Sequence, residues 1–244
     1  MPEPAFARPR HAAVAAGLAG LDAAFLEACQ CWFGGGTRIV LELHEYRESA
    51  DVDFLCASAE GYRALRSTIR ERSLGRIAAR PIPLLREVRA DRYGIRTVLA
   101  LDEVPLKFEI ILEGRVALGG MRCRGLPVAC LDHASCFAEK LLANADRGRD
   151  AAFLARDVID LAFMLEAWPA SEALEGAERA RRAYGPIVDE AARAVAQRLL
   201  DREDHRKRCV AALRVVNVKT MIAGLRRLAR GELAPPKRTR RRRA

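Results

Sequence analysis

The sequence predicts an α+β protein, with strands and flanking helices in its N-terminal half and a helical domain after them. Two observations predict this class. Apolar and polar side chains alternate along residues 105–112, which is the period of a strand. Leucine and valine recur at three- and four-residue intervals along residues 154–165, which is the period of a buried helical stripe. We expect domains at 1–125 and 126–232, followed by a basic, disordered tail at 233–244.

The individual elements follow from the same periodicities and from turn residues between them. After the glycine pair at 119–120 we expect the chain to be helical to its end. Two or three further helices are expected between the turns at 168–169 and 185–186. In chain order, the expected helices are 12–27, 37–44, 60–74, 132–144, 150–168 and 205–230, and the expected strands are 28–33, 51–56, 84–89, 95–101 and 105–112.

Composition is that of an ordinary soluble protein. Half of the 244 residues are hydrophobic and 30% are charged. The formal net charge is +10, but six of these charges lie in the tail at 237–243, so the body carries only about +4. That mild bias does not by itself indicate nucleic acid. Seven cysteines form no spacing typical of a disulfide framework, which favours a reduced, cytoplasmic protein.

The N-terminus contains a feature that mimics a signal peptide. Arg8 and Arg10 precede an apolar run at 12–21, but Asp22 interrupts it and an amphipathic pattern continues. We therefore expect no export. No apolar segment is long enough to span a bilayer, so no membrane partner is expected.

A glycine-rich turn stands ahead of two closely spaced aspartates. Gly35 and Gly36 precede Thr37, and Asp51 and Asp53 follow on the next expected strand. Glycine lets backbone N–H groups approach a phosphate, and Thr37 is expected to cap the helix that starts here. On a strand, the two aspartates point to one face with their side chains about 7 Å apart.

Two carboxylates this close repel each other unless a cation lies between them. Their hard oxygen atoms suit Mg²⁺ or Mn²⁺, which keep open positions for phosphate oxygens. Taken separately, such an aspartate pair usually consists of exposed surface residues without a functional role, and a Gly-Gly-Thr run is usually a plain tight turn. In this order and at this separation, they indicate a nucleotidyltransferase with an NTP as its substrate.

Two blocks of sequence resemble a known family. Residues 35–37, Gly-Gly-Thr, with 47–54, Arg-x-Ser-x-Asp-x-Asp-Phe, resemble the first signature of the AbiEii/AbiGii-type nucleotidyltransferase toxins. Residues 139–143, Glu-Lys-Leu-Leu-Ala, with 156–161, Arg-Asp-Val-Ile-Asp-Leu, resemble their second signature. These toxins include the MenT proteins and belong to the DNA polymerase β-like superfamily. The resemblance covers residues 33–165 in two separated blocks.

The resemblance implies a polymerase-β-like mixed sheet with flanking helices and a two-metal site. Asp51, Asp53 and Glu109 would bind the metal ions, with Glu109 supplying a third carboxylate from a neighbouring strand. One ion would lower the pKa of an acceptor hydroxyl, and the other would hold the triphosphate. Lys140 corresponds to the family's lysine that neutralises the triphosphate. Asp157 corresponds to a site residue.

The resemblance also implies contacts to the substrate and partners. The backbone at Gly35 and Gly36, together with Thr37, Arg47 and Ser49, would position the phosphates. The chain departs from the common pattern on either side of this turn, where Lys and Ala are replaced by glycine at 34 and arginine at 38. The acceptor implied is tRNA, with blocked translation as the consequence and a cognate antitoxin as a partner.

Several of these residues have a plainer interpretation. Arg47 would contact a phosphate or pair with Asp51, and its plainer interpretation is a solvated loop arginine. Glu109 is either a metal ligand or half of a cross-strand ion pair with an arginine. Asp157 lies in an apolar setting, where a carboxylate has to be paired or functional, and its partner would be a neighbouring lysine or arginine. Asp160 is a weaker site candidate.

Two other functions remain open at this point. The same site would serve for transfer of a nucleotide to a protein or to a small molecule such as an antibiotic. A non-catalytic RNA-binding regulator with a relic site is a third possibility. The basic residues of the last expected helix and the tail would either grip RNA phosphates or aid solubility.

Overall fold

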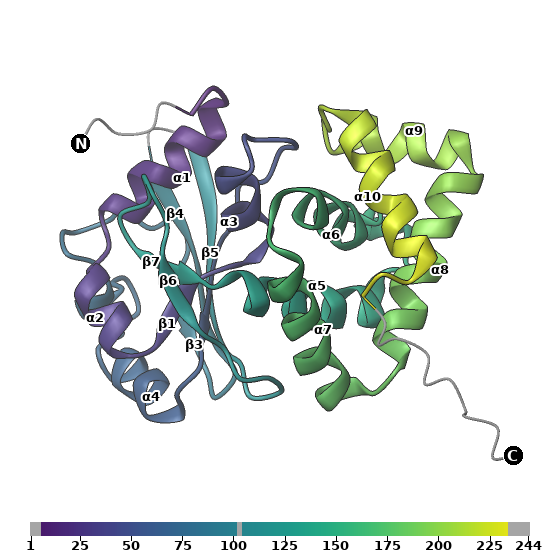
Figure 1. Cartoon of the computed structure of the whole chain (residues 1–244). Helices are drawn as coiled ribbons and strands as arrows, with labels where there is room; N and C mark the ends of the chain where they lie inside the picture. The colour runs from purple at the N-terminus through teal and green to yellow at the C-terminus, as the bar shows by residue number, and fades with distance from the viewer. Residues whose placement is uncertain (1–5, 102–103, 234–244) are drawn as a thin grey trace, which may run out of the picture.

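The structure is a computed structural model that describes residues 6–101 and 104–233. Within these residues, a seven-stranded sheet is combined with ten α-helices and two 3₁₀ helices (Figure 1). The strands are β1 (Cys31–Phe33), β2 (Val52–Cys56), β3 (Arg89–Ala90), β4 (Gly94–Leu101), β5 (Val104–Leu112), β6 (Gly120–Arg122) and β7 (Ala129–Leu131). The helices are α1 (Pro9–Ala19), α2 (Ala23–Ala28), α3 (Gly35–Glu42), α4 (Ala59–Ser67), α5 (His133–Arg147), α6 (Arg156–Ala167), α7 (Ala170–Tyr184), α8 (Ile187–Asp201), α9 (Glu203–Ala212) and α10 (Val218–Arg230), with 3₁₀ helices η1 (Gly75–Ile77) and η2 (Ala151–Phe153).

The strand order in the sheet is β3-β4-β5-β2-β1-β7-β6. Two neighbouring pairs, β2 with β5 and β1 with β7, are parallel, and the other pairs are antiparallel. The sheet is therefore mixed, and the α+β prediction is confirmed. Strand β2, which carries the aspartate pair, lies at the centre of the sheet.

The two faces of the sheet have different environments. Helices α1, α2 and α4 pack on one face, and the alternating apolar residues of β5 enter the core beneath them. Leu106, Phe108 and Ile110 are fully buried there. The side chains between them, Lys107 and Glu109, point to the opposite face, which looks toward α3 and the C-terminal helices.

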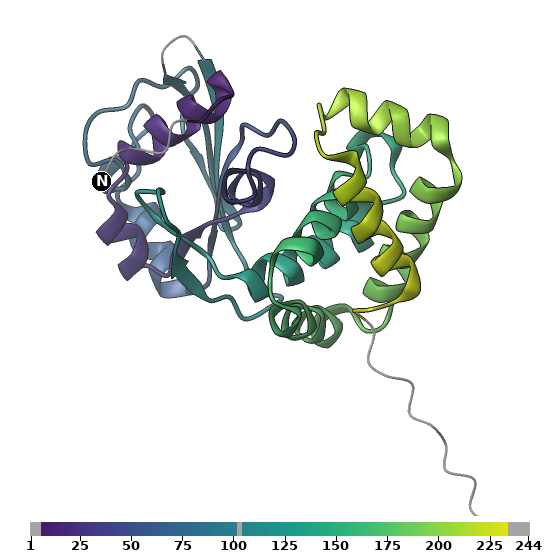
Figure 2. The same cartoon turned by 45° about the horizontal axis from the view of Figure 1, so that its top comes forward.

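A second core lies among helices α5–α10. Leu55 of β2 and Leu131 of β7 belong to this core, so it extends onto the sheet. Figure 2 shows the sheet and the C-terminal helices as two halves connected through the segment that begins α5. The site face of β2 and β5 therefore opens toward the helical half.

The expectation that the chain is helical beyond residue 120 is wrong. Strands β6 and β7 follow, and Cys130 of β7 pairs with Phe33 of β1 in parallel. Each of these strands has only three residues, which is too short to show a two-residue period. The sheet thus continues past residue 125, where we placed the domain boundary.

Three expected helices are interrupted. The one at 12–27 divides into α1 and α2, because the carboxylate of Asp22 accepts a hydrogen bond from Phe25 N and starts a new helix. The one at 150–168 is divided by Leu154 and Ala155, which both have positive φ angles. The helix expected at 205–230 divides into α9 and α10. The expected disordered tail at 233–244 lies almost wholly outside the described residues. Among those described, no helix is long and apolar enough to cross a membrane.

Candidate active site

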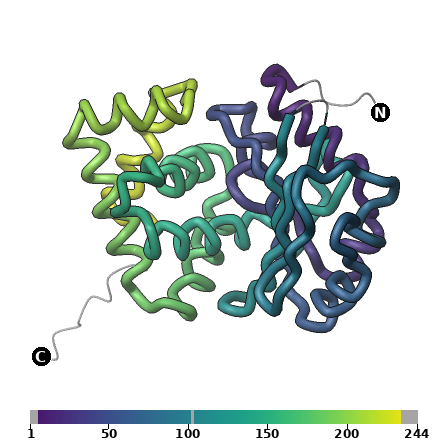
Figure 3. The backbone as a smooth tube through the Cα atoms, turned by 180° about the vertical axis from the view of Figure 1, so that it is seen from behind, coloured from purple at the N-terminus to yellow at the C-terminus, as the bar shows by residue number. Residues whose placement is uncertain are grey.

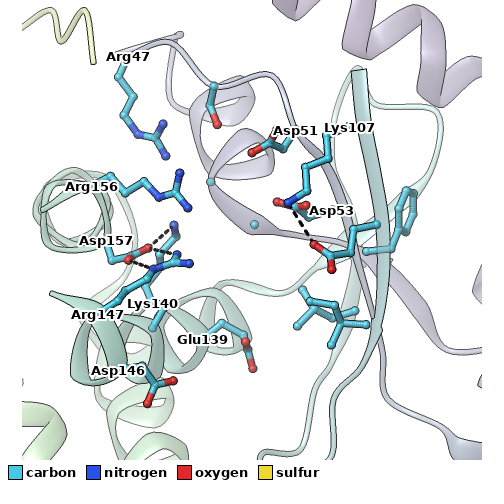
Figure 4. Close-up of a pocket in the computed structure, with 18 of the residues that line it drawn as sticks. Arg47, Asp51, Asp53, Lys107, Glu139, Lys140, Asp146, Arg147, Arg156 and Asp157 are labelled. Atoms are coloured by element: carbon cyan, nitrogen blue, oxygen red, sulfur yellow. Dashed lines mark hydrogen bonds and ion pairs between the residues drawn. The ribbon is translucent and has the colours of Figure 1, made fainter. Parts of the chain in front are cut away.

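Asp53 and Glu109 lie side by side on the parallel strands β2 and β5. They are register partners, so their side chains share one face of the sheet. Asp51 directly precedes β2, one position before the strand that we expected to contain it. Figure 4 shows Asp51 and Asp53 on the same side of the pocket, next to Lys107.

The glycine turn is held against this carboxylate pair. Gly34 N donates a hydrogen bond to Asp53 O over 2.8 Å, which fixes the start of α3 beside β2. Gly35 has a φ of +68°, and a Cβ atom there would lie 2.6 Å from Asp53 Oδ2. Both the conformation and the close approach therefore require glycine. The free backbone N–H groups at the N-terminus of α3 are those that an anion contacts.

The expectation that Thr37 caps this helix is wrong. The N-cap is Gly34, and Thr37 lies inside α3. Its buried hydroxyl is 2.9 Å from the hydroxyl of Ser49, so the two side chains bind each other. The contact ties α3 to the segment that leads into β2.

The acidic residues have unequal environments. Burial and, after it, the nearby carboxylates of Asp51 and Glu109 raise the pKa of Asp53 to about 6, against the opposing effect of Lys107. Glu109 is ion-paired on both oxygens. Arg96 Nε lies 2.5 Å from Oε1, and Lys107 Nζ lies 3.3 Å from Oε2. The cross-strand arginine pair that we considered is therefore present, on a residue that also faces the site.

Cationic side chains from α5 and α6 stand opposite. Lys140 Nζ is 3.0 Å from Asp157 Oδ1, and Arg147 holds both oxygens of Asp157 at 2.8 and 3.0 Å. Asp157 is buried, which would raise its pKa, but the attraction of Lys140 and Arg147 is larger and holds the pKa well below its usual range. Asp157 is thus paired, and it orients the two cations toward the pocket.

Arg47 is buried and is not a solvated loop residue. Its guanidinium holds Asp160 at 2.6 and 2.9 Å, and Tyr46 donates to the same carboxylate over 2.6 Å. Lys140 Nζ lies 2.6 Å from the other side of Asp160. Asp160 is therefore the buried centre of a network that joins the segment before β2 to α5 and α6.

These elements enclose one cavity of about 310 Å³. Every residue that we expected at the site lines it except Thr37 and the weaker candidate Asp160. Figure 4 shows Asp51 and Asp53 on one side of the space and Lys140, Arg147 and Arg156 of α5 and α6 on the other. The cavity therefore combines a carboxylate pair, a glycine turn at a helix start and a cluster of cations, which is an arrangement suited to a nucleoside triphosphate.

The sequence of the cavity-forming region matches a known family. The model of the nucleotidyl transferase AbiEii toxin family, of the type IV toxin–antitoxin systems, matches residues 18–221. This chain belongs to the AbiEii family. It is a nucleotidyltransferase, and the resemblance read from its two signature blocks is confirmed.

Two solved structures have the same fold as this AbiEii family member. A candidate nucleotidyltransferase from H. pylori is 18% identical, with a TM-score of 0.56 over 91% of this chain and 93% of that one. JHP933 from Helicobacter pylori is 17% identical, with a TM-score of 0.53 over 91% and 90% of the two chains. No curated protein matches the sequence.

Six charged cavity residues were not predicted as site residues from the sequence of this AbiEii chain. A signal existed for some of them. Lys107 lies two positions before Glu109 on the same strand face, and Arg156 directly precedes the aspartate of the second signature. Arg147 continues the side of the expected helix that carries Lys140, and Glu139 belongs to the second signature. For Arg115 and Asp146, only the tertiary packing reveals the position. The six are Lys107, Arg115, Glu139, Asp146, Arg147 and Arg156.

The carboxylates fit a hard divalent cation in their chemistry. Asp51, Asp53 and Glu109 offer only oxygen donors. The raised pKa of Asp53 reflects burial first and repulsion from Asp51 and Glu109 second, and a bound cation would offset both. Among the described residues, no three acidic, histidine or cysteine side chains already form a metal-binding group. In this arrangement Glu109 is ion-paired with Arg96 and Lys107.

Proposed function

We propose that this chain transfers a nucleoside monophosphate from an NTP to the 3′ end of an RNA acceptor, with tRNA as the first candidate. One observation carries this proposal: Asp53 and Glu109 face the cations of α5 and α6 across a single cavity. The tRNA acceptor rests on the resemblance to the family's toxins.

The triphosphate would bind on the side of the cations. Lys140, Arg147 and Arg156 line that part of the cavity, and Gly35 and Gly36 at the start of α3 line the cavity as well. Asp157 neutralises part of the charge of Lys140 and Arg147 and keeps them in place before substrate arrives. Preorganised cations of this kind stabilise the charge that develops on the departing pyrophosphate.

Asp51, Asp53 and Glu109 are the residues that would hold Mg²⁺ or Mn²⁺. A divalent cation bound there supplies Lewis-acid polarisation of the phosphate and lowers the pKa of the acceptor hydroxyl. The chain's own contribution is positioning. Gly35 allows Asp53 to lie against the start of α3, so the carboxylates and the phosphate-binding backbone are held within one short span.

The test is a transfer assay with each α-labelled NTP, Mg²⁺ or Mn²⁺, and total RNA. Wild type should label RNA with at least one nucleotide and release pyrophosphate. Asp53→Asn should lower the rate on the order of 100-fold or more, because it removes an anionic ligand at the reacting centre. Asp201→Asn is the matched control, since Asp201 is exposed on α8 and contacts only Gln197 among the described residues.

Three outcomes would change the assignment. If the label appears on a protein or a small molecule and RNA stays unlabelled, the acceptor is not RNA, but the chain is still a nucleotidyltransferase. Absence of transfer with all four nucleotides would refute the proposed reaction. Equal losses of transfer rate in Asp53→Asn and Asp201→Asn would show that the loss does not come from the active site.

The toxin role is a further part of the proposal. The family's description implies that expression of the active chain arrests growth and that an antitoxin relieves the arrest. Growth should stop on induction of wild type and continue with Asp53→Asn at equal protein level. Arrest by both variants would separate toxicity from nucleotide transfer.

A further inference from the structure

A second, larger groove lies beside the active site. It has a volume of about 770 Å³ and is formed by residues 86–89, by β4 and by Lys107 of β5. We call it the β3–β4 groove. Its lining contains four cations, Arg86, Arg89, Arg96 and Lys107, and one carboxylate, Glu87. Lys107 also lines the active-site cavity, so the two spaces meet at this side chain.

Strand register places a charged row between the groove and the site. Arg89 of β3 is the partner of Arg96 on β4, Arg96 is the partner of Glu109 on β5, and Glu109 is the partner of Asp53 on β2. Register partners share a face of the sheet, so all four side chains lie in one line. The row spans three strand spacings, about 14 Å, and ends at the site carboxylates.

The positive charge of the chain is concentrated in this region. Residues 63–96 contain ten arginines and three carboxylates, a net charge of +7 within a chain of +10. Six positive charges lie in the C-terminal tail, so the rest of the chain is net negative. Among the described residues, Arg86 and Arg89 form no ion pair, and both are exposed. Figure 3 shows the strand segments of this region from behind.

The proposed reaction assigns different substrates to the two sides of Glu109. The cations of α5 and α6 lie on one side, where the triphosphate and its departing pyrophosphate would bind. In an in-line displacement, the attacking hydroxyl approaches from the opposite side of the α-phosphate. The β3–β4 groove opens on the side of Glu109 that carries Arg96 and Lys107.

We propose that the β3–β4 groove binds the phosphate backbone of the single-stranded end of an acceptor RNA and directs its terminal hydroxyl to Glu109. The inference rests on the proposed function for the role of the hydroxyl. Guanidinium groups match phosphate geometry, and a row that ends at the reacting centre suits a linear polyanion. Tyr93, 60% exposed in the turn between β3 and β4, offers a ring on which a base stacks.

Fluorescence anisotropy with a labelled single-stranded RNA of about 12 nucleotides tests the groove directly. The variant is Arg86→Ala/Arg89→Ala, which leaves the site residues intact. The control is Arg193→Ala/Arg202→Ala, which removes the same charge from exposed residues of α8 and its C-cap that form no ion pair among the described residues. Thermal unfolding of each variant checks that it is folded.

The groove variant should bind the RNA about tenfold more weakly or worse. The salt dependence should also decrease, by about 0.7 in the slope of log K against log salt for each phosphate that the variant no longer binds. The control should change the Kd less than about twofold. Equal weakening in both variants, or none in the groove variant, would overturn the proposal. Displacement of the RNA by polyglutamate as effectively as by unlabelled RNA would also overturn it, in favour of an acidic protein partner.

Transfer kinetics separate this proposal from the proposed function. The groove variant should raise the KM for RNA by about tenfold and leave the KM for the NTP unchanged, because the triphosphate binds on the other side. If the groove variant transfers nucleotides to RNA as well as wild type does, the RNA-binding role of the groove is refuted and the proposed function stands. Suppose that wild type transfers no nucleotide to RNA, and that RNA binding is lost in the groove variant but not in the control. The groove is then an RNA-binding site, and the proposed reaction is refuted.

Discussion

Arg47 and Asp160, 113 positions apart in the sequence, are joined in the interior by two hydrogen bonds of 2.6 and 2.9 Å. The exposed fraction is 3% for the Arg47 side chain and 0% for Asp160. The contact fixes the segment before β2 to α6, and Lys140 Nζ joins it at 2.6 Å from Asp160. A change at Asp160 should therefore act on both the stability of the fold and the position of Lys140.

Asp160→Asn should destabilise the protein by roughly 3 to 5 kcal/mol, because it leaves the buried charges of Arg47 and Lys140 without their carboxylate. Urea unfolding followed by circular dichroism measures this. Asp201→Asn, on the surface of α8, should change the free energy of unfolding by less than about 0.5 kcal/mol. A loss below about 1 kcal/mol in Asp160→Asn would show that the network does not hold the two halves together.

The same substitution should alter the response to acid. Attraction from Arg47 and Lys140 outweighs burial and lowers the pKa of Asp160 below its ordinary value of 3.8. A lowered carboxyl pKa contributes stability above that ordinary value, and this contribution is lost as the pH falls through the folded-state pKa. The stability gap between wild type and Asp160→Asn should therefore narrow below about pH 4.

Gly35→Ala should reduce transfer by tenfold or more, because a Cβ atom at this position would lie 2.6 Å from Asp53 Oδ2 and displace it. Gly185→Ala is the control. Gly185 also has a positive φ, of +73°, but no atom lies within 4 Å of a Cβ placed there. The control should lose stability from backbone strain and keep its activity. Equal losses of activity would assign the effect to strain and not to the Asp53 contact.

Arg156→Ala should raise the KM for the NTP by about tenfold, with a smaller effect on kcat. Arg156 lines the cavity and points into it, and among the described residues it forms no ion pair (Figure 4). It is thus a cation available to the triphosphate. Arg149→Ala is the control, since Arg149 is exposed and lies outside the cavity. An unchanged KM in Arg156→Ala would place the triphosphate elsewhere.

Local sequence patterns were sufficient to predict the three carboxylates of the proposed metal site. Alternation along β5 was enough to place Glu109 on the face opposite Phe108, and the spacing of Asp51 and Asp53 gave their common side. The family blocks identified Lys140 and Asp157. Neither kind of signal gives the partner of a buried charge, because partners such as Arg47 and Asp160 meet only when β2 and α6 pack.

Other features were hidden for different physical reasons. Strands β6 and β7 are too short to display a period, and they are stabilised by the pairing of β7 with β1 and of β6 with β7. Leu154 and Ala155 have positive φ angles, which residues of this kind rarely adopt, so nothing in the sequence signals the break there. The apolar periodicity continues across it, and the segment was therefore predicted as one helix. The net positive charge of residues 63–96 was not recognised from the sequence, because the tail accounted for six of the ten net positive charges of the chain.

Glu139→Gln should stabilise the protein increasingly as the pH rises. Burial and, after it, repulsion from Glu113 raise the pKa of Glu139 to about 8, against the opposing effects of Arg115 and Lys140. A raised carboxyl pKa means that folding stability falls as the pH increases from the ordinary value of 4.5 to about 8, because the buried carboxyl must ionise. The amide cannot ionise and does not incur this loss.

Urea unfolding at about pH 5 and about pH 9 measures the effect. Glu139→Gln should gain roughly 1 to 3 kcal/mol on wild type between the two pH values, since Arg115 offsets part of the cost of the buried charge. Glu190→Gln, at an exposed position of α8, should follow wild type at both values. Parallel pH profiles for wild type and Glu139→Gln would mean that Glu139 is ionised throughout and that Arg115 fully compensates its burial.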